Sequence, residues 1–235
     1  MGRKKYEFTG ETRELYPTTI LHRIRAVIDI PSAGVNAGDI GGWIESDSNL
    51  SHRGNAWVSD NARVSGDARV SGNAWVGCDA WVDDNARVSG DARVGGDARV
   101  GGNARVGGDA RVGGDARVSG DAWVSGNARV SGDARVSGDA WVSGNARVSG
   151  DARVDGNAHI NSNKDFIIIG PIGSRSDFTT FFKNVDGIVC VTCGCFLGSV
   201  DEFLEAVQET HGDNRFGREY RLAAELANAH ILEED

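Results

Sequence analysis

The sequence predicts a mainly β protein with a β-solenoid at its centre, a β-rich N-terminal cap before it and a small α+β domain after it. The first observation is an aliphatic residue at every sixth position from Val58 to Ile160, eighteen times without a slip. The second is that the other positions read, with few exceptions, Asp or Asn, Ala, Arg or Trp, Val, Ser or Gly, and Gly. The third is the loss of this pattern on either side. We therefore expect three regions, at residues 1–54, 55–163 and 164–235.

Each hexad has the composition of a short strand followed by a corner. In Asp67–Gly72 the Ala and Val alternate with the Arg and Ser, so the two pairs point to opposite sides of a strand. Gly and the following Asp or Asn tolerate the backbone conformations of a sharp turn. A helix with 3.6 residues per turn cannot keep a valine inward at intervals of six. The repeats therefore predict a solenoid with a core of Val and Ala.

Residues 1–54 have the pattern of a β-rich cap. Residues 5–9 and 19–27 alternate or run apolar, as strands do, and Gly38-Asp39 and Gly41-Gly42 supply turns. The end of a solenoid exposes an unpaired strand edge, which promotes aggregation unless it is covered. We expect this segment to cover it.

Residues 164–235 alternate strand and helix signals. Residues 166–169 form an apolar strand, and residues 178–183 and 188–193 form a hairpin across Asn184–Gly187. Ser199 and Glu202 make a capping box that opens a helix ending at Gly212. A second helix covers residues 215–232, so a small α+β domain is expected.

Charge and composition exclude several classes of protein. The net charge is −9, and seven of those negative charges fall after residue 160, which disfavours a nucleic-acid partner. No apolar run approaches the ~20 residues of a membrane span. The four cysteines make a poor disulfide framework, which favours a cytoplasmic protein.

Several motifs carry a resemblance to a known family. These are Gly41-Gly42-Trp43-Ile44-Glu45, Asn49-Leu50-Ser51, the run Ile169–Arg175, Cys193-Gly194-Cys195-Phe196 and Thr210–Asn214. Together with the repeats, they resemble a family of phage- and prophage-encoded hexapeptide-repeat proteins that has no established activity. The resemblance implies a left-handed parallel β-helix with three hexads in each coil, hence about six coils. It also implies a homo-oligomer, with a trimer favoured, in the cytoplasm of a host cell.

Three hexads per coil would stack residues 18 apart on one face. Trp57 would then lie over Trp75, Trp123 over Trp141, and Trp81 between two arginines. Such stacking and cation–π contacts stabilise by on the order of 1 kcal/mol each. A platform for carbohydrate or a partner is the alternative interpretation, but isolated pairs of aromatic residues make no large patch. We therefore interpret the ladder as stabilising.

The sequence favours a protein that is not an enzyme. Many solenoids that look like this one are acyltransferases, which use a catalytic His, and the repeats offer only His159 as an alternative general base. Related metal-dependent carbonic anhydrases need three His ligands on the coils. No catalytic residue is therefore predicted, with His159 kept as the alternative.

The best candidate for a ligand site is the Gly-rich turn after residue 169. Its backbone N–H groups and Arg175 could hold an anion, although it lacks the Lys and spacing of a P-loop. The predicted ligand-binding residues are Gly173, Ser174, Arg175, Asp177, Thr179 and His211, with Thr180 as a further neighbour. No cofactor is expected. The alternative is a zinc site, which would use Cys190, Cys193, Cys195 and His211, with the Cys-x-Cys thiols on one face of a strand.

The leading hypothesis is a non-enzymatic phage or prophage accessory protein. Its solenoid would be a scaffold that presents the C-terminal module to a host protein or to a small, nucleotide-like anion. An acyltransferase and a structural component of the virion are the alternatives.

Overall fold

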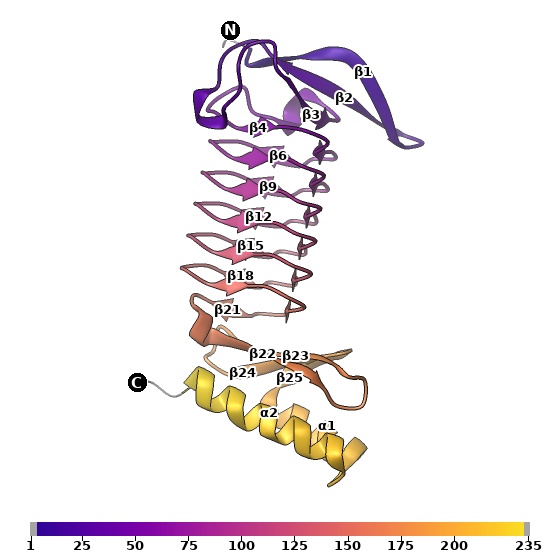
Figure 1. The fold of residues 1–235 in the computed structure, drawn as a ribbon, viewed down its shortest axis with the longest axis vertical. Coiled ribbons are helices and arrows are strands. Elements are labelled where there is room, and N and C mark those ends of the chain that lie inside the picture. Colours follow the sequence, from indigo (N-terminus) through magenta and orange to yellow (C-terminus); the bar gives the residue numbers. More distant parts are fainter. Residues whose placement is uncertain (1–3, 233–235) are drawn as a thin grey trace.

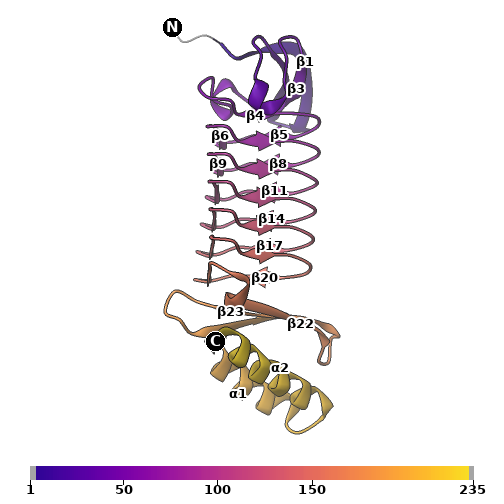
Figure 2. The ribbon, with the colours of Figure 1, turned by 60° about the vertical axis from the view of Figure 1, so that its left-hand side comes forward.

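The computed structural model describes residues 4–232 and shows an elongated molecule. A hairpin with its loops lies at one end, a column of stacked coils follows, and a sheet with two helices closes the other end (Figure 1). The regular coils consist of two-residue strands separated by corners, so each coil has three sides (Figure 2).

The three sides of the coils form three parallel sheets, here called faces I, II and III. The strands of face I are β4 (Trp57–Val58), β7 (Trp75–Val76), β10 (Arg93–Val94), β13 (Arg111–Val112), β16 (Arg129–Val130) and β19 (Arg147–Val148). Those of face II are β5 (Arg63–Val64), β8 (Trp81–Val82), β11 (Arg99–Val100), β14 (Arg117–Val118), β17 (Arg135–Val136) and β20 (Arg153–Val154). Those of face III are β6 (Arg69–Val70), β9 (Arg87–Val88), β12 (Arg105–Val106), β15 (Trp123–Val124), β18 (Trp141–Val142) and β21 (His159–Ile160).

Residues 18 apart pair in parallel, as Arg93 does with Arg111, which confirms three hexads to a coil. The alanines and valines of the repeats point inward and are at most 2% exposed. Between Ala62 and Val154 the buried hydrophobic side chains of this core are all Val or Ala, and their small size lets the three faces approach each other.

The solenoid has about seven turns, one more than the repeats supply. Strand β3 (Ile40–Ile44) pairs in parallel with β5, and Leu50 bridges Val70, so residues 40–58 form a coil before the regular ones. Ile44 and Leu50 are fully buried and already lie six residues apart. The interval from Leu50 to Val58 is eight residues, which hides this coil from a search for an unbroken repeat.

The N-terminal hairpin extends face II beyond the first coil. Strand β1 (Tyr6–Tyr16) pairs antiparallel with β2 (Thr19–Ala26), and β2 pairs antiparallel with β3, which gives face II nine strands in all. The turns η1 (Pro31–Ala33) and η2 (Asp47–Asn49) lie in the following connections. The hairpin projects sideways from the column (Figure 1).

The C-terminal module has one antiparallel sheet and two helices. After η3 (Asn163–Asp165), the sheet runs in the order β22 (Phe166–Ile172), β23 (Asp177–Lys183), β24 (Val189–Cys193), β25 (Phe196–Ser199). Helices α1 (Val200–His211) and α2 (Arg215–Leu232) follow. Both helices, the hairpin and the capping box at Ser199 agree with the sequence predictions.

The sheet of this module lies between the solenoid and the helices. Phe166 and Phe182 join the hydrophobic core of the solenoid on one side. Phe181, Val189 and Val191 pack with the helices on the other. Successive residues of a strand point to opposite faces, so one short sheet both closes the solenoid and builds a second core.

Candidate functional site

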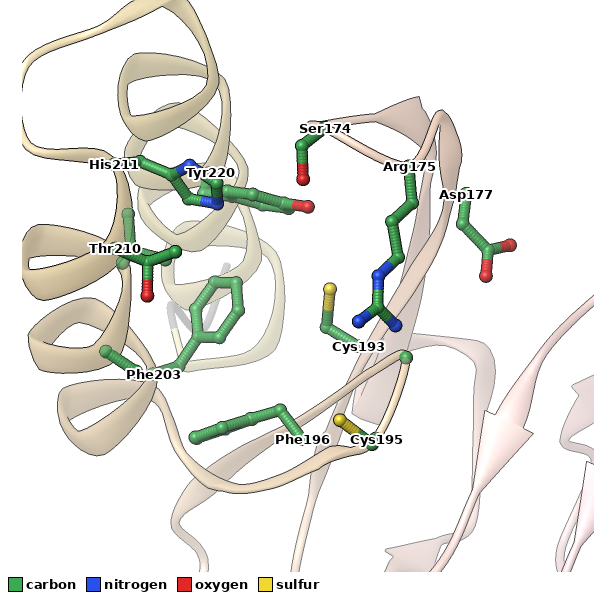
Figure 3. A pocket seen from close by; sticks show the side chains of 13 residues that line it. Ser174, Arg175, Asp177, Cys193, Cys195, Phe196, Phe203, Thr210, His211 and Tyr220 are labelled. Carbon is green, nitrogen blue, oxygen red and sulfur yellow. The ribbon is translucent and has the colours of Figure 1, made fainter.

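A cavity of about 230 Å³ opens in the C-terminal module. Three walls surround it: the turn between β22 and β23, the turn between β24 and β25, and one side of α1 and α2 (Figure 3). The lining residues are Ser174, Arg175, Asp177, Cys193, Gly194, Cys195, Phe196, Phe203, Ala206, Val207, Thr210, His211 and Tyr220.

The helix side of the cavity is apolar and aromatic. The ring of Phe203 lies 5.4 Å from Phe196 in a tilted arrangement and 5.4 Å from Tyr220, edge to face. The ring of His211 is 5.7 Å from Tyr220. Because Phe203 and Tyr220 are 4% and 6% exposed, packing against neighbouring rings holds both side chains in place.

Arg175 supplies a positive charge on the opposite wall. Its guanidinium extends toward the turn that carries Cys193 and Cys195 (Figure 3). A Cβ at Gly194 would stand 2.6 Å from Nη1 of Arg175, so the absence of a side chain there lets the guanidinium cross the turn. Within residues 4–232 this guanidinium has no carboxylate at ion-pair distance, and its charge is available to a ligand.

The carboxylate nearest to Arg175 in sequence has another partner. Asp177 lies 3.8 Å from Nη2 of Arg153, which belongs to the last strand of face II. The backbone N–H of Arg153 also donates to Oγ1 of Thr180, at 3.0 Å. The charge of Arg153, on the solenoid, therefore partly offsets that of Asp177 at the mouth of the cavity.

The Gly-rich turn already binds a carboxylate of its own chain. The N–H of Gly173 donates to Glu219 at 2.8 Å, and Arg215 donates to the same carboxylate at 2.7 Å. The hydrogen bonds from Arg215 and from Gly173 lower the pKa of Glu219. A Cβ at Gly173 would stand 1.9 Å from the hydroxyl oxygen of Tyr220, so this glycine lets the tyrosine reach the turn.

Tyr220 and Cys193 meet at the base of the cavity. Burial, together with the neighbouring thiol of Cys193, raises the pKa of Tyr220 to about 12, and hydrogen bonds from Ser174 oppose this rise. The tyrosine is therefore a neutral hydroxyl at physiological pH. Thr179 donates to Sγ of Cys193 at 3.4 Å, which fixes the thiol beneath the aromatic rings.

The structure brings most of the predicted ligand-binding residues together. Ser174, Arg175, Asp177 and His211 line the cavity. Gly173 borders it through Tyr220, and Thr179 is buried behind Cys193. Thr180 faces the solenoid instead, because neighbouring residues on a strand point to opposite sides.

The alternative zinc site is not formed. Cys190 packs with the solenoid core, whereas Cys193 packs with the helices, so the two thiols are on opposite faces of β24. Cys195 is in the turn after β24, and the prediction that it shares a strand face with Cys193 was wrong. Among residues 4–232 no three His, Cys, Asp or Glu side chains cluster as metal ligands do.

Sequence reasoning missed the aromatic half of the site. Phe196, Phe203, Thr210 and Tyr220 come from β25, α1 and α2. The apolar stripes of the two helices were visible in the sequence, but they indicate a packed core equally well. Only the packing of the helices on the sheet shows that the sheet leaves part of each apolar stripe uncovered, where it lines the cavity.

The tryptophan ladder is present on two of the faces. Trp123 and Trp141 stack at 5.1 Å with planes 4° apart, and the guanidinium of Arg63 lies 4.7 Å from the ring of Trp81. Trp57 is only 1% exposed, because the added coil and its Gly41 cover it, so its assignment to a surface ladder was wrong. His159 ends the ladder on face III, 5.2 Å from Trp141.

The comparisons with known proteins match the solenoid. A family model described as the YdcK beta solenoid repeat matches residues 62–77, 98–114, 110–126, 128–144 and 140–156. The repeats of this chain are similar to that solenoid. This supports the β-solenoid that the phage-family resemblance implied, and all five matched stretches end before the cavity begins. A search of curated proteins finds no match to the chain. Neither of the helices between residues 4 and 232 is long and apolar enough to span a lipid bilayer.

Proposed function

We propose that this chain is a non-enzymatic scaffold protein whose C-terminal module binds a small organic anion carrying one planar ring. Its solenoid is a rigid column that holds the module at one end. The observation that carries the proposal is the unpaired guanidinium of Arg175 at the mouth of an aromatic cavity.

The charge of the ligand follows from Arg175. An arginine stays protonated at any physiological pH, and its planar fork matches the geometry of a carboxylate or a phosphate. Asp177, the acidic residue nearest to Arg175 in sequence, pairs with Arg153 instead, at 3.8 Å. The side chain of Ser174 lies on the same wall as Arg175 (Figure 3), where it hydrogen-bonds to Tyr220.

The ring of the ligand follows from the opposite wall. Phe196, Phe203 and His211 present ring faces and edges to the cavity, and aromatic pairs favour offset or edge-to-face contact. Sites for drug-sized ligands measure about 300–1,000 Å³, so the volume of about 230 Å³ suits one ring with one anionic group. A nucleotide would place only its base or its phosphate inside.

The biological setting in the proposal is that of a phage or prophage accessory protein in a host cytoplasm. The resemblance of the flanking motifs supports it, and each of the motifs Ile169–Arg175, Cys193–Phe196 and Thr210–Asn214 contributes residues to the lining of the cavity. In this setting the ligand is a small metabolite or signal of the host.

Titration calorimetry and ligand-observed NMR on the full chain test the proposal. The probes are inorganic phosphate and a set of ring-bearing carboxylates and phosphates that includes benzoate and adenosine monophosphate. We expect at least one ring-bearing anion to bind more tightly than phosphate. Arg175→Gln should weaken it by about tenfold or more, since a hydrogen bond to a charged group contributes about 1.5–3 kcal/mol.

The matched control is Arg218→Gln, which removes an exposed arginine of the same module outside the cavity. This variant should bind as the wild type does. Failure of the whole set to bind, or equal binding by Arg175→Gln, would overturn the proposal.

A further inference from the structure

A gap interrupts the column of serines on face III, between strands β9 and β15. The residue that follows the valine is Ser89 in one coil and Ser125 two coils later, but it is Gly107 in the coil between them. A cavity of about 340 Å³ lies at this gap, with both serines and Trp123 in its lining. Figure 1 shows β9, β12 and β15 one above the other in the middle of the column, away from the C-terminal module.

The backbone does not require a glycine at this position. Gly107 is outside the left-handed region, unlike its neighbour Gly108, whose φ is +62°. A Cβ at Gly107 would meet the hydroxyl oxygen of Ser89 at 3.6 Å, which is an ordinary contact. Because neither the conformation nor the packing excludes a serine, the missing side chain leaves a space that the fold does not need.

The missing hydroxyl also leaves an indole N–H without a partner. Trp141 donates its N–H to Oγ of Ser125, the residue 16 positions earlier, at 3.4 Å. The ring of Trp123 stacks on that of Trp141 with planes 4° apart, but the residue 16 positions before Trp123 is Gly107. Within residues 4–232 the N–H of Trp123 has no hydrogen-bond acceptor. The cavity therefore has a free donor on this wall.

Two arginines line the cavity from neighbouring coils. Arg87 and Arg105 pair in register and are exposed, and neither has a carboxylate at ion-pair distance within residues 4–232. Strands of a sheet lie about 4.8 Å apart, so two permanently protonated side chains leave the sheet next to each other and repel. Among the described residues that line the cavity there is no Asp or Glu. An oxyanion with two charges would satisfy both arginines at once.

One side of the Trp123 ring is open to the cavity. Trp81, on face II, has an arginine over its ring from the coil before and from the coil after, at 4.7 and 5.4 Å. The neighbours of Trp123 in register are Trp141 and Arg105. Trp141 covers one side of the ring at 5.1 Å, but in the described chain no guanidinium lies over Trp123. The side toward Arg105 is therefore free for a ligand.

We propose that this gap, here called the Gly107 site, binds a small phosphate monoester that carries an aromatic ring. The phosphate accepts hydrogen bonds from Arg87, Arg105 and the N–H of Trp123, and its charge of about −2 matches the two guanidiniums. The aromatic ring stacks on the open side of Trp123. The volume of about 340 Å³ is within the range of about 300–1,000 Å³ for small-molecule sites. The Gly107 site is separate from the C-terminal cavity and does not depend on its ligand.

A second cavity beside a tryptophan, on face I, has a different character. It is lined by Trp75 and Arg93, but the carboxylate of Asp91 lies beside the arginine. Asp91 would repel a phosphate and offset the charge of Arg93. The absence of a carboxylate from the lining is what makes the Gly107 site suitable for an anion.

NMR on the isotope-labelled full chain tests the proposal, because the six tryptophans each give an indole N–H signal. The Trp123 signal is assigned by its loss in Trp123→Phe. The probes are inorganic phosphate and phenyl phosphate, and Arg175→Gln is the parent chain, so that binding in the C-terminal cavity is weakened. We expect both probes to shift the Trp123 signal and phenyl phosphate to bind more tightly. Arg87→Gln and Arg105→Gln should each weaken binding by about tenfold or more.

Gly107→Ser separates the site from the fold. Its added hydroxyl would fill the gap and accept from the N–H of Trp123, as Ser125 accepts from Trp141. We expect this variant to lose phosphate binding while its melting temperature stays unchanged or rises. The matched control is Gly113→Ser, at the same position of the next hexad, where a Cβ would meet no atom closer than 3.8 Å. The control should bind as the parent does.

Four outcomes would overturn the proposal. The first is a Trp123 signal that neither probe moves. The second is equal affinity for the two probes, because the aromatic ring would then have no place on Trp123. The third is a folded Gly107→Ser variant that still binds. The last is a loss of binding in Gly113→Ser as large as that in Gly107→Ser.

Discussion

Asp177, at the mouth of the cavity, pairs with Arg153 of the solenoid at 3.8 Å and not with Arg175 of its own turn. Arg153 also reaches the carbonyl of Gly194, at 3.5 Å, so one arginine joins the last coil to two turns of the module. Under the proposed function this contact couples the scaffold to the site, because an unpaired Asp177 carboxylate would compete with an anion for Arg175.

Removing that arginine should weaken anion binding without removing a group that touches the ligand. In Arg153→Gln the carboxylate of Asp177 loses its partner, competes for Arg175 and repels an anion, so the affinity should fall severalfold. Adding Asp177→Asn should restore it. Because both charges are partly exposed, the pair stabilises the fold by at most about 1 kcal/mol, and binding by calorimetry is the readout. The control is Arg147→Gln, one strand earlier on face I; equal losses in both variants would contradict the coupling.

The two glycines at one corner should differ in their tolerance of alanine. Gly108 has a φ of +62°, and a Cβ there would stand 2.9 Å from the backbone N of Gly126 in the next coil. At Gly107 the nearest atom is Oγ of Ser89, at 3.6 Å. We expect Gly108→Ala to lower the unfolding free energy by about 1–2 kcal/mol or more, and Gly107→Ala to change it little. Urea unfolding of the pair decides, and equal losses would contradict this account of the corner.

Cys78 occupies a corner position where most hexads have glycine. Its φ is +57°, which costs a residue with a side chain about 1–2 kcal/mol. Asp84 has a similar φ, but its Oδ2 accepts a hydrogen bond from the N–H of Gly102 at 2.9 Å, which offsets the cost. Cys78→Gly should therefore raise the melting temperature, whereas Asp84→Gly should raise it less or lower it. The reverse order in calorimetric scans would show that strain is not what distinguishes the two sites.

The buried amine of Lys5 makes the stability of the fold increase with pH. Its side chain is 1% exposed and donates to the carbonyl of Ala56, and burial lowers its pKa from 10.5 to about 8. Between pH 8 and 10.5 the unfolded chain binds more protons at this site than the folded chain does, so folding gains free energy as the pH rises. Below pH 8 both states are protonated and the full cost remains, on the order of 3 kcal/mol.

The variant Lys5→Met separates the pH-dependent cost of burying a charge from the loss of the hydrogen bond to Ala56. The lost hydrogen bond affects the variant equally at every pH, so only the charge of Lys5 can make the stability difference depend on pH. The free energy of unfolding of the variant minus that of the wild type should be largest at pH 7. This difference should become smaller toward pH 10, because the wild type gains stability there. Urea unfolding at both pH values measures it. A difference that does not change with pH would mean that Lys5 keeps its ordinary pKa in the folded chain.

The sequence predicts the solenoid well because its signal is local and repeated. One buried valine and one buried alanine in each hexad set the strand, the corner and the 18-residue register. The coil at Ile44 and Leu50 was missed, because five residues of a different character, Ser51–Asn55, interrupt the spacing. Trp57 was misplaced for the same reason, since the missed coil is what buries it.

The candidate site could be predicted only in part, because its two halves are encoded differently. The Gly-rich turn with Arg175 is contiguous, so its residue types already suggested an anion. Phe203 and Tyr220 are 17 residues apart on two helices, and nothing local distinguishes an aromatic residue in a core from one that lines a cavity. The role of Arg153, which belongs to a repeat of near-identical arginines, depends on its being next to the module.

We expect Gly173 to be the residue of the turn that tolerates alanine least, because a side chain there would collide with Tyr220. Gly187, which has a similar φ but no such neighbour, serves as the comparison for backbone strain alone. Gly173 and Gly187 have φ values of +71° and +80°, so alanine at either position costs about 1–2 kcal/mol in backbone strain. A Cβ at Gly173 would also stand 1.9 Å from the hydroxyl oxygen of Tyr220, whereas at Gly187 the nearest atom is Cε of Lys183, at 3.7 Å.

Gly173→Ala must therefore move a buried ring, and we expect it to lower the unfolding free energy by more than Gly187→Ala does and to reduce anion binding as well. Urea unfolding and calorimetry on the two variants measure both effects. If Gly187→Ala were equally damaging to binding, Tyr220 would not be the link between the turn and the cavity. If Gly173→Ala changed only the stability, Tyr220 would contribute to packing alone. Anion binding would then depend on Arg175 and not on the position of Tyr220.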